Sequence, residues 1–230
     1  MTVPAGASLA LNGGTLDPAG TDVQIAGAVT LGAGDLNNAG SVAIAAGGSL
    51  DGGSGNVSLF GNWSNLGTFT AATGSVSFVD GGSTASNIAG STTFDNVSFV
   101  SNVGKTYSFA VGSTQTIGGL LTILGTPAQG IQLKSAVAGQ VANINLRPTG
   151  TQDIQHVGVS NVHATGQHLA SNQTNDGGGG DAVGWFGAAT GGNGGNVAPT
   201  PMMSSLNLLL LSLLVVFAAF LFRRNFPHRT

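Results

Sequence analysis

Residues 13–20 read Gly-Gly-Thr-Leu-Asp-Pro-Ala-Gly, and residues 33–40 read Ala-Gly-Asp-Leu-Asn-Asn-Ala-Gly. The two segments place Leu16 and Leu36 twenty residues apart, and the segment ending at Leu50 matches them more loosely after 14 more residues. Self-similarity at such a spacing is typical of stacked structural repeats. One coil of this size cannot bury its inward side chains alone. We therefore expect successive coils to stack as a β-solenoid, with parallel strands and one continuous column of small apolar residues.

Apolar residues alternate with other residues in very short runs along residues 1–187. Pairs such as Val23/Ile25 and Ile144/Leu146 place their side chains on one face of a strand. Turn signals such as Asn12-Gly13-Gly14 separate the runs, because Gly and Asn adopt positive φ at little cost. No stretch before residue 200 shows helical periodicity with caps. The sequence therefore predicts an all-β fold.

The pattern divides the chain into four segments. Residues 1–80 are predicted to form regular solenoid coils, because their turns come too often for a β-sandwich, whose strands return about every 8–12 residues. Residues 81–187 have longer runs, so they either continue the solenoid or form a β-sandwich-like end region. Residues 188–204 form a Gly/Asn/Pro linker, and residues 205–230 are predicted to be a membrane helix with a basic tail.

The composition excludes several classes of protein. Charged residues make up 7 % of the chain, which has nine Asp, no Glu and no Cys. Residues 1–200 hold three basic and nine acidic residues, a net charge of −6, so they lack the positive surface of a nucleic-acid binder. The absence of Cys excludes disulfides and thiolate metal sites. Coiled coils are rich in Glu, Lys and Arg, so this class is excluded too. We predict no cofactor.

The C-terminal segment carries the clearest local signal. Residues 206–222 read LNLLLLSLLVVFAAFLF, and a helix of this length spans about 25 Å, slightly less than the hydrocarbon core of a bilayer. Basic residues beside a span stay in the cytoplasm, so the N-terminus is predicted to lie outside. The predicted membrane-contacting residues are Leu206, Leu208, Leu214, Phe217 and Phe222, and the predicted cytoplasmic anchor is Arg223, Arg224 and Arg229.

The N-terminal residues show neither a basic region nor a long apolar stretch, so no signal peptide is predicted there. The predicted orientation nevertheless requires residues 1–200 to be exported. The simplest hypothesis is that the chain is an N-terminally truncated form of a longer secreted precursor.

Two longer stretches carry a family resemblance. Residues 61–78, GNWSNLGTFTAATGSVSF, and residues 88–97, IAGSTTFDNV, resemble coils of bacterial surface proteins with right-handed parallel β-helix repeats. Residues 157–166 and the segment from Asn175 to Phe186 resemble the terminal coils of the same group. This resemblance implies a right-handed parallel β-helix and a location on the cell surface more than it implies any activity.

The tail resembles a second group. Ala198-Pro199-Thr200-Pro201, a short polar spacer, an apolar span and Arg223-Arg224 are similar to PEP-CTERM or IPTL-CTERM sorting signals. The resemblance implies that Pro199, Thr200 and Pro201 form the sorting motif. It also implies recognition by an exosortase-type membrane enzyme of a Gram-negative bacterium. Pro201 stands where the second type usually has Leu, so the sorting class stays open.

Candidate chemical sites are weak. His156, His163 and His168 are not spaced to converge on a metal, and exposed turn or strand positions are expected for them. The loop from Asp176 to Asp181 is expected to be a solvated glycine loop rather than a calcium site. A glycosidase needs two carboxylates that flank the bond. Asp17 and Asp35 could stack on neighbouring coils, but turn chemistry explains them. Packing is the expected role of Trp63, Tyr107 and Trp185.

The sequence thus predicts a non-enzymatic, structural or adhesin-like protein of the cell surface or envelope. Its precursor would be a single-pass inner-membrane protein with its N-terminus outside. Membrane lipid and a sorting enzyme are the expected partners, together with a surface polysaccharide or a host or matrix ligand, and no nucleic acid. Two alternatives stay open: a carbohydrate-binding or polysaccharide-degrading β-helix module, and a fragment of a larger surface protein without a function of its own.

Overall fold

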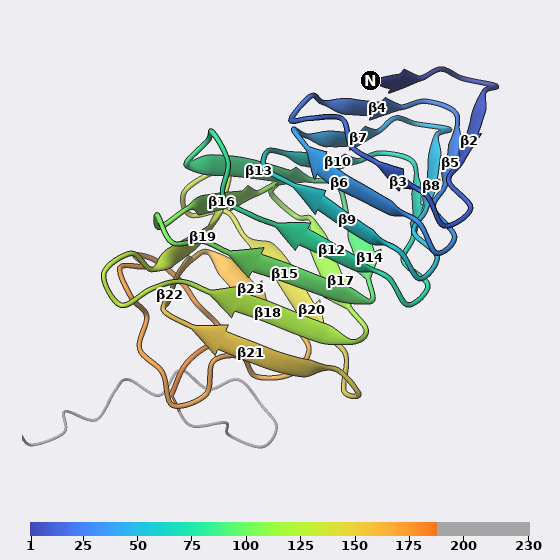
Figure 1. The fold of residues 1–230 in the computed structure, drawn as a ribbon. Helices are drawn as coiled ribbons and strands as arrows, with labels where there is room; N and C mark the ends of the chain where they lie inside the picture. Colours follow the sequence, from blue (N-terminus) through green and yellow to red (C-terminus); the bar gives the residue numbers. More distant parts are fainter. Residues whose placement is uncertain (188–230) are drawn as a thin grey trace, which may run out of the picture. The chain divides into compact units, whose positions relative to one another are not determined.

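The computed structural model describes residues 1–187, which fold as a parallel β-solenoid of eight coils (Figure 1). The described residues contain strands and turns but no helix. On one side of the solenoid, each strand pairs in parallel with the strand of the preceding coil, as Val42 pairs with Val23 and Gln132 with Thr106. The predicted all-β solenoid is confirmed. The predicted membrane helix, residues 205–230, lies outside the described residues.

Two long sheets form two sides of the solenoid, and each receives one strand from almost every coil. Sheet A contains β1 (Thr2–Val3), β4 (Val23–Ile25), β7 (Val42–Ile44), β10 (Trp63–Asn65), β13 (Ala85–Ala89), β16 (Thr106–Phe109), β19 (Ile131–Ser135) and β22 (Val157–Ser160). Sheet C contains β3 (Thr15–Leu16), β6 (Asp35–Ala39), β9 (Asn56–Leu59), β12 (Ser75–Phe78), β15 (Asn96–Val100), β18 (Leu120–Leu124) and β21 (Thr151–Gln155).

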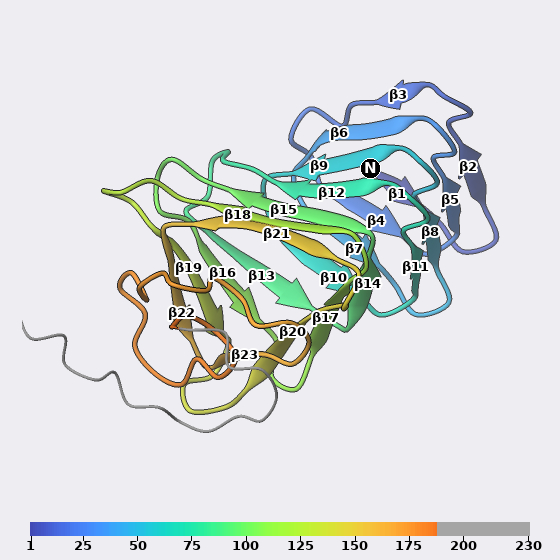
Figure 2. The same ribbon diagram turned by 90° about the horizontal axis from the view of Figure 1, so that it is seen from below.

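The remaining strand of each coil belongs to one of two shorter sheets, which divide the coils into a first and a last group of four (Figure 2). Sheet B contains β2 (Ser8–Ala10), β5 (Ala28–Thr30), β8 (Ser49–Asp51) and β11 (Thr68–Thr70). Sheet D contains β14 (Thr92–Phe94), β17 (Thr114–Ile117), β20 (Ala142–Leu146) and β23 (Val162–Ala164). The neighbouring strands β11 and β14 contact each other but share no hydrogen-bonded ladder.

Inward residues stack on the equivalent residues of the next coil. Leu16 pairs with Leu36, so the twenty-residue repeat read from the sequence is confirmed. The looser match at Leu50 is wrong: Leu50 lies in sheet B and pairs with Val29 and Phe69. The reason is that two corners of a coil use the same local chemistry, a glycine turn followed by a short apolar strand.

A column of glycines forms the corner between sheets B and C in the first four coils. Gly14, Gly34, Gly55 and Gly74 occupy equivalent positions, and the Gly14 and Gly55 carbonyls accept hydrogen bonds from residues of the next coil. A Cβ atom at Gly34, Gly55 or Gly74 would collide with the carbonyl oxygen of the equivalent glycine in the preceding coil. Only glycine therefore allows the coils to approach this closely.

Aromatic side chains enter the core at the fourth coil. The buried apolar residues that precede Trp63 in the described chain are all aliphatic. Trp63 packs edge-on against Phe69, with ring centroids 5.1 Å apart, and Phe78 stacks on Phe99 at 4.8 Å. Tyr107 is fully buried beside the same rings. The packing role expected for the three large aromatic residues is observed, since Trp185 is also buried.

Residues 165–187, here called the cap, cover the end of the eighth coil without forming a named strand. Within the cap, Leu169 and Trp185 pair in a single parallel bridge, and both are buried against the core. Sheets A and D reach the eighth coil through β22 and β23, whereas sheet C stops at β21. The cap therefore closes an end at which the three sides of the solenoid finish at different levels.

Candidate functional site

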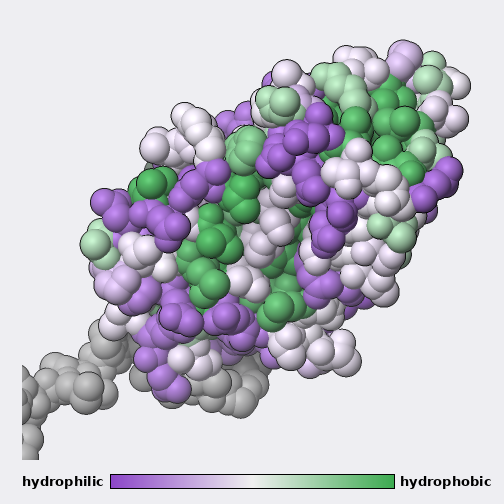
Figure 3. All heavy atoms as spheres, in the orientation of Figure 1, coloured by the Kyte–Doolittle hydropathy of each residue, from purple (hydrophilic) through white to green (hydrophobic). Residues whose placement is uncertain are grey.

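The outer face of sheet C carries a row of hydroxyl side chains. Ser58, Ser77, Ser98 and Thr122 are in register on neighbouring strands, and Ser98 Oγ donates to Ser77 Oγ at 3.0 Å. The inward neighbours of this row are buried apolar residues, so the alternation predicted from the sequence separates core from surface. In the view of Figure 3, small apolar and hydrophilic areas alternate across the surface, with no single broad apolar patch.

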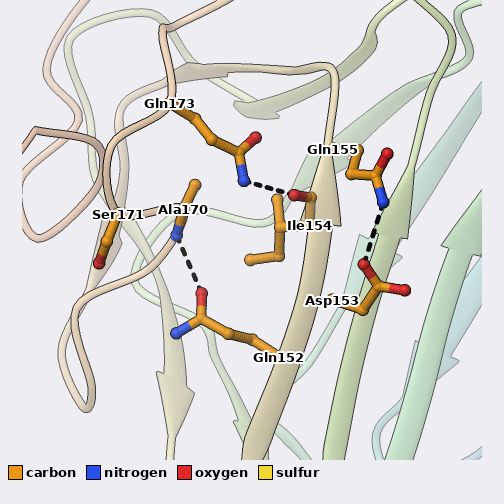
Figure 4. Close-up of a pocket in the computed structure, with 7 residues that line it drawn as sticks. All are labelled: Gln152, Asp153, Ile154, Gln155, Ala170, Ser171 and Gln173. Atoms are coloured by element: carbon orange, nitrogen blue, oxygen red, sulfur yellow. Dashed lines mark hydrogen bonds between the residues drawn. The ribbon is translucent and has the colours of Figure 1, made fainter.

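A depression of about 360 Å³ lies between β21 and the cap (Figure 4). The residues that line it are Gln152, Asp153, Ile154, Gln155, Ala170, Ser171 and Gln173. A second depression adjoins it and shares Gln155 and Gln173 with the first. Figure 4 shows that the side-chain amides of Gln152 and Gln173 reach across to main-chain atoms on the opposite wall.

The lining of the first depression combines side-chain amides with a single carboxylate. Asp153 supplies the only carboxylate among its seven lining residues, and Gln155 Nε2 donates to that carboxylate at 3.4 Å. Retaining and inverting glycosidases both require a pair of carboxyl groups. The lining of this depression therefore holds one carboxyl group, where a glycosidase of either kind uses two.

The three histidines considered as metal ligands lie at the seam between the solenoid and the cap. His163 Nε2 is 3.1 Å from Asp181 Oδ2, and His156 Nδ1 is 3.6 Å from Asp176 Oδ2. The third histidine, His168, contacts the Phe186 carbonyl. Each histidine is therefore paired with a different group of the cap. Within the described residues, no three His, Cys, Asp or Glu side chains converge as a metal site.

The same contacts change the interpretation of the glycine loop from Asp176 to Asp181. We expected a solvated loop, and the structure uses both of its carboxylates to hold the cap. Sequence spacing could not reveal these pairs, because each joins residues from opposite sides of the seam, His156 with Asp176 and His163 with Asp181. Such partly exposed ion pairs contribute little stability individually.

The two aspartates considered as a stacked pair have different roles. Asp17 Oδ1 accepts from Ala19 N at 2.7 Å, so turn chemistry accounts for this residue. Asp35 lies in strand β6 and accepts from Asn56 N of the next coil at 2.8 Å, so the turn role expected for it is wrong. Asp35 pairs in register with Thr15 rather than with Asp17, so the two carboxylates are not stacked.

Lys105 is a buried charged residue that sequence reasoning did not identify. Its ammonium donates to the carbonyls of Phe60 and Val79, and the Tyr107 ring centroid lies 5.4 Å away. Burial lowers the pKa of Lys105, and the nearby Asp80 charge partly opposes that effect. Burial, together with Asp80, raises the pKa of Tyr107. Both side chains are shielded from solvent, so they hold a corner of the solenoid rather than meeting a substrate.

The predicted sorting and membrane residues lie outside the described residues. These are the motif Pro199, Thr200 and Pro201, the span from Leu206 to Phe222, and the basic residues Arg223, Arg224 and Arg229. In the part of the chain that the structure does describe, residues 1–187, no helix is long and apolar enough to cross a membrane.

Comparisons with protein-family models, with curated proteins and with solved structures found no match to this chain.

Proposed function

We propose that this chain is a non-enzymatic protein of the bacterial cell surface or envelope, with a structural or adhesin-like role. In this proposal the solenoid is displayed outside the cell, and residues 205–230 hold it at the inner membrane. A sorting enzyme of the exosortase type then acts near Pro199, Thr200 and Pro201. The proposal combines the observed parallel solenoid with the sequence patterns of the tail.

The observation that carries the proposal is the composition of the outer face of sheet C. Its central row places the half-buried hydroxyls of Ser58, Ser77, Ser98 and Thr122 on this face, and these side chains carry no charge. A surface of this kind offers many hydrogen bonds and has little charge repulsion between copies. Both properties suit adhesion or the formation of a matrix.

The solenoid also provides a rigid spacer. Neighbouring parallel strands lie about 4.8 Å apart, so eight coils project a surface over about 34 Å. Every coil is hydrogen-bonded to the next along two or three sides. Such a stack supports a surface role without any catalytic residue.

Mass spectrometry of the cell envelope tests the proposed location and processing. Cells that produce the full chain should yield a surface-exposed product that ends near Pro199, and protease added to intact cells should digest it. A variant with Pro199, Thr200 and Pro201 all changed to Ala should accumulate with its C-terminal peptide intact. A wild-type product that keeps this peptide and resists external protease would contradict the proposal.

The depression beside β21 favours one second candidate, a carbohydrate-binding module. Its walls offer amide groups, one hydroxyl and one carboxylate, which are groups that bind sugar hydroxyls. Full chain in detergent should then bind immobilised polysaccharides, and Asp153→Asn with Gln155→Ala should abolish that binding. Equal retention of the variant and the wild type would count against this candidate.

A further inference from the structure

The C-terminal end of the solenoid is closed in two ways. Main-chain groups of the cap bond directly to β22 and β23, as Asp176 N does to Val157 O and Ala164 N to Val183 O. Elsewhere, side-chain amides occupy the places of main-chain groups.

The side chain of Gln152, in β21, shows this replacement best. Its Nε2 donates to His168 O at 2.9 Å, and its Oε1 accepts from Ala170 N at 2.9 Å. The carboxamide thus bonds to His168 and Ala170, the residues on either side of Leu169. In a parallel ladder, the main-chain N–H and C=O of one residue bond to the neighbouring strand in the same way.

On its other side, Leu169 is bonded to main-chain groups instead of a side chain. There Leu169 N donates to Gly184 O, and Phe186 N donates to Leu169 O, which is the parallel bridge to Trp185. Leu169 therefore has a main-chain partner on one side and the Gln152 carboxamide on the other. Sheet C continues past β21 by means of a side chain.

Two further carboxamides close neighbouring edges. Asn175 accepts from Val159 N through Oδ1 at 2.7 Å, and its Nδ2 donates to Val159 O at 3.0 Å. Both main-chain groups of this β22 residue are therefore satisfied by one cap side chain. Gln173 Nε2 donates to the Ile154 carbonyl of β21. An unpaired strand edge recruits other chains, and these amides occupy the groups that would do so.

We propose that the C-terminal end of the solenoid is a self-association surface for a second copy of this chain, held closed by the carboxamides of Gln152, Gln173 and Asn175. With the cap displaced, β22 and β23 present free edges in the eighth coil, and β21 presents one in the seventh. The partner of such an end must carry strands with the same spacing and polarity.

A second copy fits along sheet A, because each sheet A strand of this chain already pairs in parallel with the sheet A strand of the next coil. The inner edges of β21, β22 and β23 are bonded to β18, β19 and β20 of the same chain. At the opposite end of the solenoid, β1 is the first strand of sheet A. Because neighbouring strands of sheet A are parallel, β1 of a second copy has the polarity needed to continue the stack from tail to head. The closing bonds act on the fold alone, so the proposal does not depend on the surface role proposed above.

The test compares full-length variants in detergent micelles. Gln152→Ala combined with Asn175→Ala removes four of the closing hydrogen bonds. The matched control, Gln24→Ala combined with Asn102→Ala, removes one exposed glutamine and one exposed asparagine that make no side-chain hydrogen bond with the described residues. Two quantities are measured: amide hydrogen exchange in residues 157–160 and 168–170, and particle mass by light scattering at increasing concentration.

The proposal predicts at least about tenfold faster exchange in those residues for the closing variant, and a mass that grows with concentration in multiples of one chain. The control variant should match the wild type in both measurements. Faster exchange without any growth in mass would overturn self-association, and unchanged exchange would overturn the closing role of the amides. If the double variant loses its strand signal in circular dichroism, Asn175→Ala alone, which removes two bonds, is judged by the same outcomes.

Discussion

The first four coils and the last four coils are built on the same two long sheets, yet they differ in regularity. In the first group the sheet A strands follow one another closely along the chain, as Val23 and Val42 do, and the core is aliphatic until Trp63. In the last group the partners lie further apart, as Thr106 and Gln132 do, and aromatic rings share the core. The comparison teaches that aromatic rings alone do not set the length of a coil. The coil from Ala85 to Thr106 holds Phe94 and Phe99, yet it is shorter than the coil from Ile131 to Val157, whose buried apolar residues are all aliphatic.

The junction between the two groups is polar inside. Asn65, Thr92 and Gln115 lie inward on three successive coils, and all three are buried. Ile44 pairs with Asn65 in the coil before, and Ile144 pairs with Gln115 in the coil after. Thr92 Oγ1 accepts from Trp63 Nε1 at 3.0 Å and from Asn65 Nδ2 at 3.3 Å. This short polar column marks the place where sheet B ends and sheet D begins.

The largest loss of stability is expected from a substitution in the glycine column of the first four coils. Gly55→Val should destabilise the solenoid by about 5 kcal/mol, because its Cβ atom would collide with the Gly34 carbonyl. Thermal unfolding followed by circular dichroism measures the loss. Gly179→Ala is the control, because a Cβ atom at that position meets no neighbour. Equal melting temperatures for the two variants would show that the glycine column does not set the coil spacing.

The second effect compares the two cores directly. Trp63→Ala should cost about 4 kcal/mol of unfolding free energy and Leu36→Ala about 3 kcal/mol, because the cavity left by an indole ring is larger. Chemical denaturation of both variants gives the difference. A greater loss at Leu36 would contradict the view that an aromatic ring in the core carries more packing energy than an aliphatic side chain.

A smaller effect is expected at the polar junction. Thr92→Val should cost about 2 kcal/mol, because it leaves Trp63 Nε1 and Asn65 Nδ2 without their acceptor. Thr92→Ser keeps the oxygen and should cost only about 1 kcal/mol, the value of one buried methyl group. Urea unfolding measures the loss of unfolding free energy in both variants. A larger loss for Thr92→Ser than for Thr92→Val would show that Thr92 contributes through packing and not through its hydrogen bonds.

The smallest effect concerns pH. The folded pKa of Lys105 is lowered, so below about pH 10.5 the unfolded chain binds more protons and stability should rise as the pH approaches that value. The folded pKa of Tyr107 is raised, so stability should fall as the pH increases above about 10. Urea unfolding between about pH 8 and 11 should show both trends for the wild type. Tyr107→Phe should lose the fall above about pH 10, and an unchanged fall would assign it to another group.

The regular part of this fold could be predicted because its signals are local. The spacing of Leu16 and Leu36 and the alternation in runs such as Val23 to Ile25 follow from one coil and its turns. The match at Leu50 failed for the same reason, since a local signal does not say which corner of a coil it belongs to.

The candidate site was harder to predict because its contacts are not local. Gln152 bonds to His168 and Ala170 in the cap, and Lys105 bonds to the carbonyl of Phe60, two coils earlier. In the sequence, Gln and Lys read as surface residues. Their roles depend on main-chain groups that only the stacked coils bring within reach.

The short reach of the coil-to-coil pairings sets the order in which this molecule can assemble. Each paired strand finds its partner one coil away, and the longest such step joins Leu120 to Thr151. A chain that emerges gradually from a ribosome or a membrane pore can therefore add one coil at a time. Residues 165–187 emerge after all eight coils, so a growing chain passes through a stage in which the coils are finished and their end is not yet covered. Stalled translation at that stage would release a species prone to association, although its coils are already complete.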